Sequence, residues 1–211
     1  MIRVSAFKWV PPFARGLVRD LRVRWALEEA GLPYEERLIV RDDQSSEGYR
    51  ALQPFGQVPS YEEDGLVLFE SGSIVLHIAE RSDALLPSDP KARARAKTWM
   101  FAALNTIEPP IQHLTGLDLF YAEEEWAKLR RPGAVEAVQM RLLELARALD
   151  GREYLEGRFS AGDLLMTTVL RILRHTDLVA RQPELEAFQQ RCEARPAFKK
   201  ALAAQMAAFV G

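Results

Sequence analysis

The chain has 211 residues, of which 48% are hydrophobic and 27% charged, with a formal net charge of -2 and an isoelectric point near 6.0. This length and apolar content suffice for one large domain or two small domains with buried cores. So balanced a charge gives no electrostatic basis for binding nucleic acid or an anionic membrane, and we expect a small, soluble partner.

The rare residue types narrow the function classes further. The single cysteine, Cys192, excludes an internal disulfide and a Cys-x-x-Cys redox motif. His77, His113 and His175 are scattered, with no carboxylate or cysteine at ligand spacing, so no metal site is predicted. No run approaches the roughly 18 apolar residues of a membrane helix, and the first ten residues lack a signal-peptide pattern. We therefore expect a cytoplasmic protein.

The first 80 residues alternate strand and helix patterns. In chain order they predict a strand at 4–9, a helix at 14–30, a strand at 34–40, a short helix at 44–52, a hairpin at 58–69 and a helix after residue 71. Gly31 and Pro33 are typical of the end of the long helix. This order of elements matches a thioredoxin-like domain.

Residues 56–80 carry the most specific pattern. The turn signal at 63–65, Glu-Asp-Gly, separates two short strands of a hairpin. Pro59 removes a backbone donor at the start of its strand, so Val58 can present its backbone groups to an extended ligand instead of a neighbouring strand.

Glu70 and Ser71 lie where the next helix begins. A helix N-terminus offers free N–H groups and a positive dipole end to a carboxylate, and Ser71 adds a hydroxyl donor. Glu70 can pair with an ammonium group, so the two residues suit the head of a free α-amino acid. A serine at such a position is also an ordinary helix cap, and the residues alone leave that alternative open.

This segment resembles the glutathione-binding half of the glutathione S-transferases, in which Val-Pro, an acidic turn and Glu-Ser or Gln-Ser follow one another in this order. The resemblance implies that Glu70 and Ser71 hold the γ-glutamyl end of glutathione, and that Val58 pairs with the cysteinyl backbone. It also implies that Gln57 reaches the glycine or cysteinyl end and that Pro59 follows a cis peptide bond.

The loop after the first strand departs from the family pattern. Members usually carry Tyr, Ser or Cys there to stabilise the glutathione thiolate, whereas residues 8–16 contain none of these. The catalytic group is therefore unknown, and three candidates remain: Lys8 and Arg15 as cations, and Trp9, which the resemblance places at the glycine end. The alternatives are that Lys8 faces water and that Trp9 is a packing residue.

Other polar residues near this loop have simpler interpretations. Ser5 is expected to be buried in the first strand, too early to reach a thiol. The arginines of the long helix predict a solvated face paired with Glu28 and Glu29. These arginines are Arg15, Arg19, Arg22 and Arg24.

A Pro-bearing segment at 81–90 has the composition of an exposed linker. From 91 to 211 only helical periods appear, separated by Pro or Gly. The predicted fold class is therefore α/β plus all-α: a thioredoxin-like, glutathione-binding domain at 1–80, a linker at 81–90 and a helical-bundle domain at 91–211. Ser160 and Asp163 predict a capping box before a buried helix, and the same box recurs in the transferase family.

The resemblance implies that the helical domain shapes a pocket for an acceptor molecule, with Phe13 and Asn105 as candidate lining residues. It also implies a homodimer, in which Tyr49 or Phe55 is an aromatic residue inserted between subunits.

The predicted function follows from the likeness to bacterial, cytosolic glutathione transferases. The protein would bind glutathione as a co-substrate and promote attack of its thiolate on a small hydrophobic electrophile, without a metal and without a nucleic-acid or membrane partner. One alternative is a glutathione-dependent isomerase or peroxidase. Another is a non-catalytic ligand-binding protein of the same fold, which the missing loop hydroxyl favours.

Overall fold

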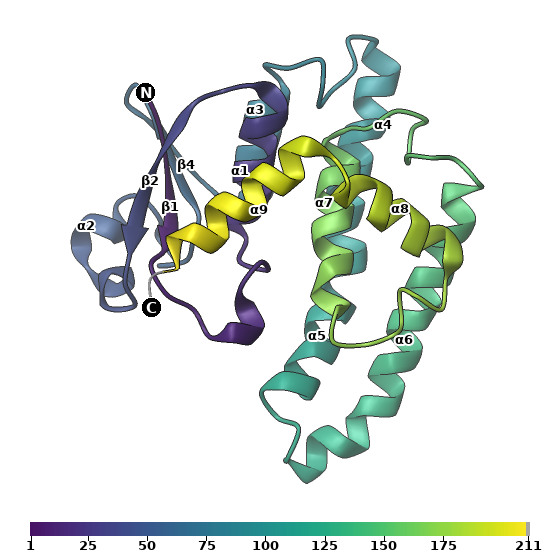
Figure 1. Ribbon diagram of the computed structural model, residues 1–211. Helices are drawn as coiled ribbons and strands as arrows, with labels where there is room; N and C mark the ends of the chain where they lie inside the picture. The colour runs from purple at the N-terminus through teal and green to yellow at the C-terminus, as the bar shows by residue number, and fades with distance from the viewer. Residues whose placement is uncertain (210–211) are drawn as a thin grey trace. The chain divides into compact units, whose positions relative to one another are not determined.

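The computed structural model describes residues 1–209 (Figure 1). Contacts divide the chain into two compact units. The first unit comprises Met1–Leu86 together with the segment that begins at Ala194, and the second unit is Pro87–Glu193. The predicted fold class is confirmed: the first unit is a mixed sheet with flanking helices, and the second is helical.

The sheet of the first unit has four strands in the order β2-β1-β3-β4. β1 runs parallel to β2, and β3 runs antiparallel to both of its neighbours. The hairpin turn is Asp64-Gly65, with φ of 48° and 87°, as expected for a two-residue turn that needs positive φ at both positions. The strands are β1 (Ile2–Phe7), β2 (Tyr34–Ile39), β3 (Ser60–Glu63) and β4 (Leu66–Phe69).

Helices cover both faces of this sheet (Figure 1), with α1 and α3 on one side and α2 on the other. The alternation along β1 explains this, because Ile2, Val4 and Ala6 are buried on one face while Ser5 and Phe7 point to the other. The helices of the first unit are α1 (Asp20–Ala30), α2 (Glu47–Arg50), α3 (Ser71–Ala79) and α9 (Pro196–Ala208), with short 3₁₀ turns at Pro12–Ala14 and Asp42–Ser45.

The start of α1 differs from the prediction of a helix from residue 14. Only a single 3₁₀ turn forms at Pro12–Ala14, and Arg15 then leaves it in an extended conformation. Gly16 follows with φ of 77°, which a right-handed helix cannot accommodate. The connection between β1 and α1 is therefore a long loop, residues 8–19.

The prediction of a solvated arginine face on this helix is also wrong. Arg22 and Arg24 are only 3% and 1% exposed. Arg24 donates to Asp20 at 2.7 Å and also pairs with Glu36 on β2. Burying a guanidinium requires such paired carboxylates. Asp20 lies one helical turn before Arg24, but Glu36 belongs to a different element, which helical spacing cannot indicate.

Glu28 and Glu29 were predicted to pair with the arginines of α1, but they bind side chains of α9 instead. Glu29 accepts two hydrogen bonds from Arg195, at 2.6 and 2.7 Å, and Glu28 accepts one from Lys200 at 2.7 Å. Trp25 meets Phe198 edge-on, with ring centroids 4.8 Å apart. By contacts, the last helix thus groups with the first unit, although the sequence predicted a helical domain that continues to residue 211.

A buried amide joins α9 to the long loop. Gln205 Nε2 donates to the Val18 carbonyl at 3.0 Å and to Asp20 Oδ1 at 2.7 Å. Asp20 is fully enclosed, and burial raises its pKa, against the lowering effect of Arg24 and Gln205. The end of the loop and the start of α1 are therefore tied to the last helix of the chain.

The second unit is a helical bundle around α7, in which every residue from Ala161 to Leu170 is buried. The predicted capping box is confirmed, and Asp163 also accepts from the Leu155 backbone at 2.8 Å. Burial raises the pKa of Asp163 to about 6. The helices are α4 (Pro90–Phe101), α5 (Glu108–Leu119), α6 (Glu125–Leu149), α7 (Ala161–Leu170) and α8 (Pro183–Glu193), with a 3₁₀ turn at Arg171–Leu173.

A π-helical segment, Ala102–Ile107, joins α4 to α5. Pro109 and Pro110 lack N–H groups, so the carbonyls of Asn105 and Thr106 have no α-helical donor four residues on. Within residues 1–209, no helix combines the length and the apolar character that a membrane crossing requires.

Candidate functional site

Three segments of the first unit meet at one end of the strands of its sheet. Val4 lies opposite Tyr61, so the antiparallel register brings the end of β1 next to the beginning of β3. Ser60 lies opposite Phe69, so Pro59 and Glu70 flank the same end of the hairpin. The parallel strands β1 and β2 also have their carboxyl ends here. Open α/β sheets bind their ligands outside the carboxyl ends of the strands.

The first segment contains a cis peptide bond between Val58 and Pro59, as predicted. The Val58 side chain packs with Ile39 and Tyr49 in a small core cluster. Its backbone N–H and C=O find no hydrogen-bond partner within residues 1–209. A residue with a fixed side chain and free backbone groups is suited to pairing with a peptide-like ligand.

The second segment is the start of α3. Glu70 precedes the helix with φ of 67° and ψ of 113°, a conformation that side chains normally avoid, and no side chain caps the helix. Ser71 is the first helical residue, so the alternative of an ordinary serine cap is wrong. Ser71 is buried, and its Oγ accepts a hydrogen bond from Arg22 Nη1 at 3.2 Å.

The third segment is the loop after β1. Lys8 is exposed, in agreement with the simpler alternative for this residue, although its backbone N–H donates to Ile39 at 2.9 Å. Trp9 is 55% exposed, so the alternative of a packing residue is wrong. Arg15 is half-buried, and its Nε has no hydrogen-bond partner in the described chain. Phe13 is exposed on the same loop.

The remaining predicted residues are placed as follows. Gln57 is exposed next to Val58, and Asn105 is exposed within the π-helical segment of the second unit. Phe55 is 63% exposed and meets Phe69 edge-on, with centroids 6.0 Å apart. Tyr49 is buried, so its prediction as an aromatic residue inserted between subunits is wrong.

Two hydrogen-bonded pairs that support the site could not be predicted from the sequence. In the first, Arg22 lies directly behind Ser71, and in the second, Ser5 and Tyr49 lie behind the Val58–Pro59 segment. Each pair joins residues more than 40 positions apart, so no local spacing could have revealed it.

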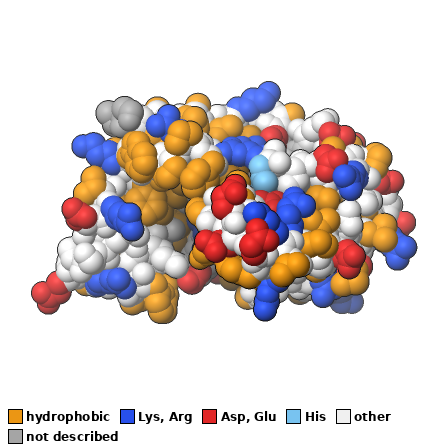
Figure 2. Space-filling model, turned by 90° about the horizontal axis from the view of Figure 1, so that it is seen from below, with side chains coloured by type: hydrophobic (Ala, Val, Ile, Leu, Met, Phe, Trp, Pro, Cys, Tyr) orange, Lys and Arg blue, Asp and Glu red, His pale blue; other side chains and the backbone are white. Residues whose placement is uncertain are grey.

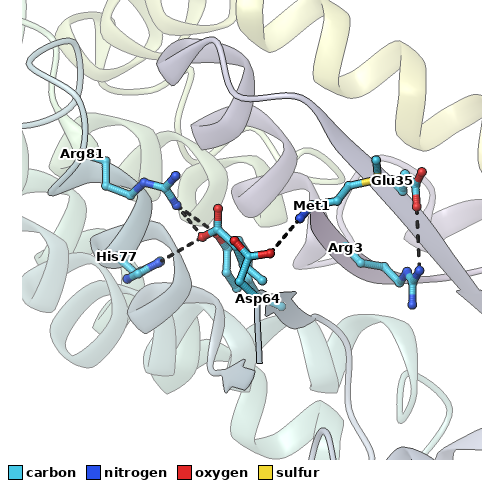
Figure 3. A network of polar contacts seen from close by, with 8 residues as sticks. Met1, Arg3, Glu35, Asp64, His77 and Arg81 are labelled. Carbon is cyan, nitrogen blue, oxygen red and sulfur yellow. Dashed lines mark hydrogen bonds and ion pairs between the residues drawn. The ribbon is translucent and has the colours of Figure 1, made fainter. Parts of the chain in front are cut away.

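The charges at the hairpin turn pair with one another. Figure 3 shows Arg81 and His77 directed at the same carboxylate, that of Glu63, while Asp64 meets the N-terminal ammonium of Met1 at 3.1 Å. Hydrogen bonds from Arg81 and from Tyr61 lower the pKa of Glu63. This network holds the turn and does not contribute to the candidate site at the other end of the hairpin.

One face of the surface bears on the class of partner. In Figure 2, Lys and Arg side chains are interspersed with Asp and Glu side chains and with apolar groups. Nucleic acids and anionic membranes are bound through extended positive fields. This face gives no electrostatic support for such a partner.

Comparison with known proteins points to one family. Residues 21–87 match the family model described as the N-terminal domain of glutathione S-transferase. A glutathione S-transferase of Hyoscyamus muticus is 30% identical over 203 residues, which cover 86% of this chain and 92% of that protein. Glutathione S-transferase 4 of Zea mays is 28% identical over 210 residues, or 93% of this chain and 91% of that protein.

Solved structures agree with this match. A glutathione transferase of Burkholderia graminis, solved with two glutathione molecules per subunit, superposes with a TM-score of 0.83 at 28% identity, over 96% of this chain and 88% of that one. Glutathione transferase F7 of Populus trichocarpa also gives a TM-score of 0.83, at 25% identity over 98% and 99% of the two chains. The chain belongs to the glutathione S-transferase family.

Proposed function

We propose that this protein binds glutathione at the carboxyl ends of strands β1 and β2 and promotes attack of the glutathione thiolate on a hydrophobic electrophile. The observation that carries the proposal is the free backbone of Val58, which lies at the same end of the hairpin as Glu70 and Ser71. An extended peptide with an amino-acid head fits these two features together. The structure of the Burkholderia graminis relative, which contains glutathione, supports the same ligand.

The γ-glutamyl end would lie at α3. The uncapped N–H groups of the first turn and the Ser71 hydroxyl would donate to its carboxylate, and the Glu70 carboxylate would accept from its ammonium group. Arg22 orients Ser71: because its Nη1 donates to Oγ, the hydroxyl proton of Ser71 is left to point elsewhere, toward a ligand.

The cysteinyl and glycine parts would continue along the loop. Val58 would exchange backbone hydrogen bonds with the cysteinyl residue, next to Pro59, and Gln57 and Trp9 are exposed where the glycine end would lie.

Activation of the thiol falls to the loop at 8–19. Lowering the thiol pKa by two units requires about 2.7 kcal/mol of preferential stabilisation of the thiolate. Of the three candidates, Arg15 fits this task best, because its Nε is buried and has no partner within the described residues, whereas Lys8 is exposed. One charge-assisted hydrogen bond supplies much of the required energy.

The rest of the proposal follows the family. The acceptor would be a small hydrophobic electrophile, with Phe13 and Asn105 as candidate contacts, and the protein would be a cytoplasmic homodimer. Phe55 remains the candidate for an aromatic contact between subunits, since it is exposed. A non-catalytic carrier is the second candidate, because the loop from residue 8 to 19 contains no Tyr, Ser or Cys.

Calorimetric titration with glutathione tests the proposal, with the ultraviolet absorbance of the thiolate followed over a pH series. We expect binding with a thiol pKa well below that of free glutathione, and Arg15→Gln to raise that pKa while Lys8→Gln leaves it unchanged. Binding with an unshifted thiol would favour the carrier, and no binding at millimolar glutathione would refute the proposed site.

Ser71→Ala provides the site-specific check on that titration. It should weaken glutathione binding about tenfold, equivalent to about 1.4 kcal/mol. Ser73→Ala, an exposed serine two residues further along α3, is the matched control and should bind as the wild type does.

A further inference from the structure

A buried chain of three hydrogen bonds runs behind the Val58–Pro59 segment. The backbone N–H of Ser60 donates to Ser5 Oγ at 2.6 Å. Ser5 Oγ lies 2.8 Å from Tyr49 Oη, and Tyr49 Oη donates to the backbone carbonyl of Gln57 at 2.7 Å. Both hydroxyl-bearing side chains are buried, with exposures of 1% and 5% for Ser5 and Tyr49.

The two ends of this chain determine the direction of every proton in it. A backbone N–H can only donate and a backbone carbonyl can only accept. Ser5 therefore accepts from Ser60, and Tyr49 uses its single proton on Gln57. The Ser5 proton is left to donate to Tyr49, so each hydroxyl donates once and accepts once. Burial raises the pKa of Tyr49, which keeps its proton in place.

The two ends of this hydrogen-bond chain lie on either side of the Val58–Pro59 segment, which is proposed to bind the ligand. Gln57 precedes Val58–Pro59 and Ser60 follows it, and both are held through their backbone groups. Tyr49 reaches the segment from α2, and Ser5 reaches it from the central strand β1. The backbone of Val58 itself is left unpaired between these two anchors, within the described residues.

We infer that Ser5 and Tyr49 are positioning residues, which hold the Val58 backbone in the orientation that receives the cysteinyl backbone of glutathione. The inference rests on the proposed glutathione site. Neither side chain touches the ligand; the pair acts by ordering the segment before binding, so that less conformational entropy is lost when the ligand pairs with it. A single linked chain also acts as a unit, because each hydroxyl polarises the next.

Tyr49→Phe and Ser5→Ala test the inference, since each removes one hydroxyl from the chain. Tyr61→Phe is the matched control: it removes the hydroxyl of another buried tyrosine of the first unit, one that donates to Glu63 at 2.6 Å and not to the segment. Calorimetry with glutathione is carried out well below the melting temperature of each folded variant. We expect Tyr49→Phe and Ser5→Ala each to weaken binding about tenfold, or about 1.4 kcal/mol, and Tyr61→Phe to leave it unchanged.

Two further readouts separate positioning from a general loss of stability. In a conjugation assay with a chlorodinitrobenzene, the KM for glutathione should rise in Tyr49→Phe while kcat stays within about twofold, because glutathione binding is weakened equally in the ground state and in the transition state. The double variant should lose little more affinity than the worse single variant, since breaking either link interrupts the same chain. Fully additive losses would contradict the linked chain.

The possible failures are distinguishable. If the wild type does not bind glutathione, the proposed function is wrong. If the wild type binds and Tyr49→Phe binds equally well, or if Tyr61→Phe weakens binding by the same factor, the positioning role is wrong while the glutathione site stands. If Tyr49→Phe does not fold, Ser5→Ala decides the same question, because it removes the other hydroxyl of the hydrogen-bond chain.

Discussion

At Glu70 the backbone is held at φ 67° and ψ 113°, directly before the first turn of α3. Asp64 and Asp150 also have positive φ, but they lie in a hairpin turn and at a helix C-terminus, where such angles are ordinary. The strain at Glu70 therefore requires another explanation. A carboxylate aimed at a bound ammonium group provides one, because a functional constraint can maintain a conformation that stability alone disfavours.

Glu70→Gly separates stability from binding at this position. Glycine tolerates positive φ, so the free energy of unfolding should stay the same or rise by about 1 kcal/mol. Glutathione affinity should fall at least tenfold, since the partner of the ammonium is lost. Chemical denaturation and calorimetry measure the two quantities. Asp64→Gly, also at positive φ, is the control and should retain full affinity; a stable Glu70→Gly with unchanged affinity would contradict this explanation.

At the scale of elements, α9 packs along the length of α1. The ion pair of Arg195 with Glu29 lies near one end, the edge-on pair of Trp25 and Phe198 in the middle, and the Gln205 amide at the other end. Only the last of these contacts reaches the long loop that carries the candidate thiol-activating groups. The helix thus supports that loop through one buried side chain.

Gln205→Ala should therefore be costly. It removes a donor from the buried Asp20 Oδ1 and from the Val18 carbonyl, although that carbonyl still accepts from the Leu21 N–H at 3.0 Å. The loss at the buried carboxylate should lower the free energy of unfolding by about 1 to 3 kcal/mol. Lys200→Ala removes an ion pair with a solvent-exposed lysine of the same helix and should lower the free energy of unfolding much less. Urea denaturation of both variants decides this; equal losses would mean that Gln205 only helps to dock α9.

Which elements could be predicted from the sequence depended on the distance along the chain between the residues that form them. The hairpin and the capping box were predicted correctly because their signals, Asp64-Gly65 and Ser160 with Asp163, are local. The start of α1 was not, because whether Gly16 continues a helix or leaves it depends on what packs around it. Contacts such as that between Gln205 and Asp20 join residues 185 positions apart, and no spacing rule reaches across that distance.

At the scale of the whole molecule, contacts make the first unit discontinuous in sequence: it is completed by α9, after the second unit has intervened. Stability should follow this grouping and not the order of the chain. The expected opening units are therefore Met1–Leu86 with α9 on one hand and Pro87–Glu193 on the other.

Hydrogen exchange of the intact protein tests this grouping. Phe198→Ala leaves a cavity against Trp25 and should cost about 3 to 5 kcal/mol, so exchange should accelerate in α1 and β1 more than in α7. Leu165→Ala, in the centre of α7, should show the reverse order. Equal acceleration throughout in both variants would mean that the two units open together.

The position of α9 after the whole second unit has a consequence during synthesis. A ribosome adds about 5 to 20 residues per second, so roughly 6 to 25 seconds pass between completion of the hairpin region and emergence of the helix that covers Trp25. Throughout that interval the nascent chain displays the apolar side of α1 without its cover. The first unit is therefore complete only after the whole of the second unit has been synthesised.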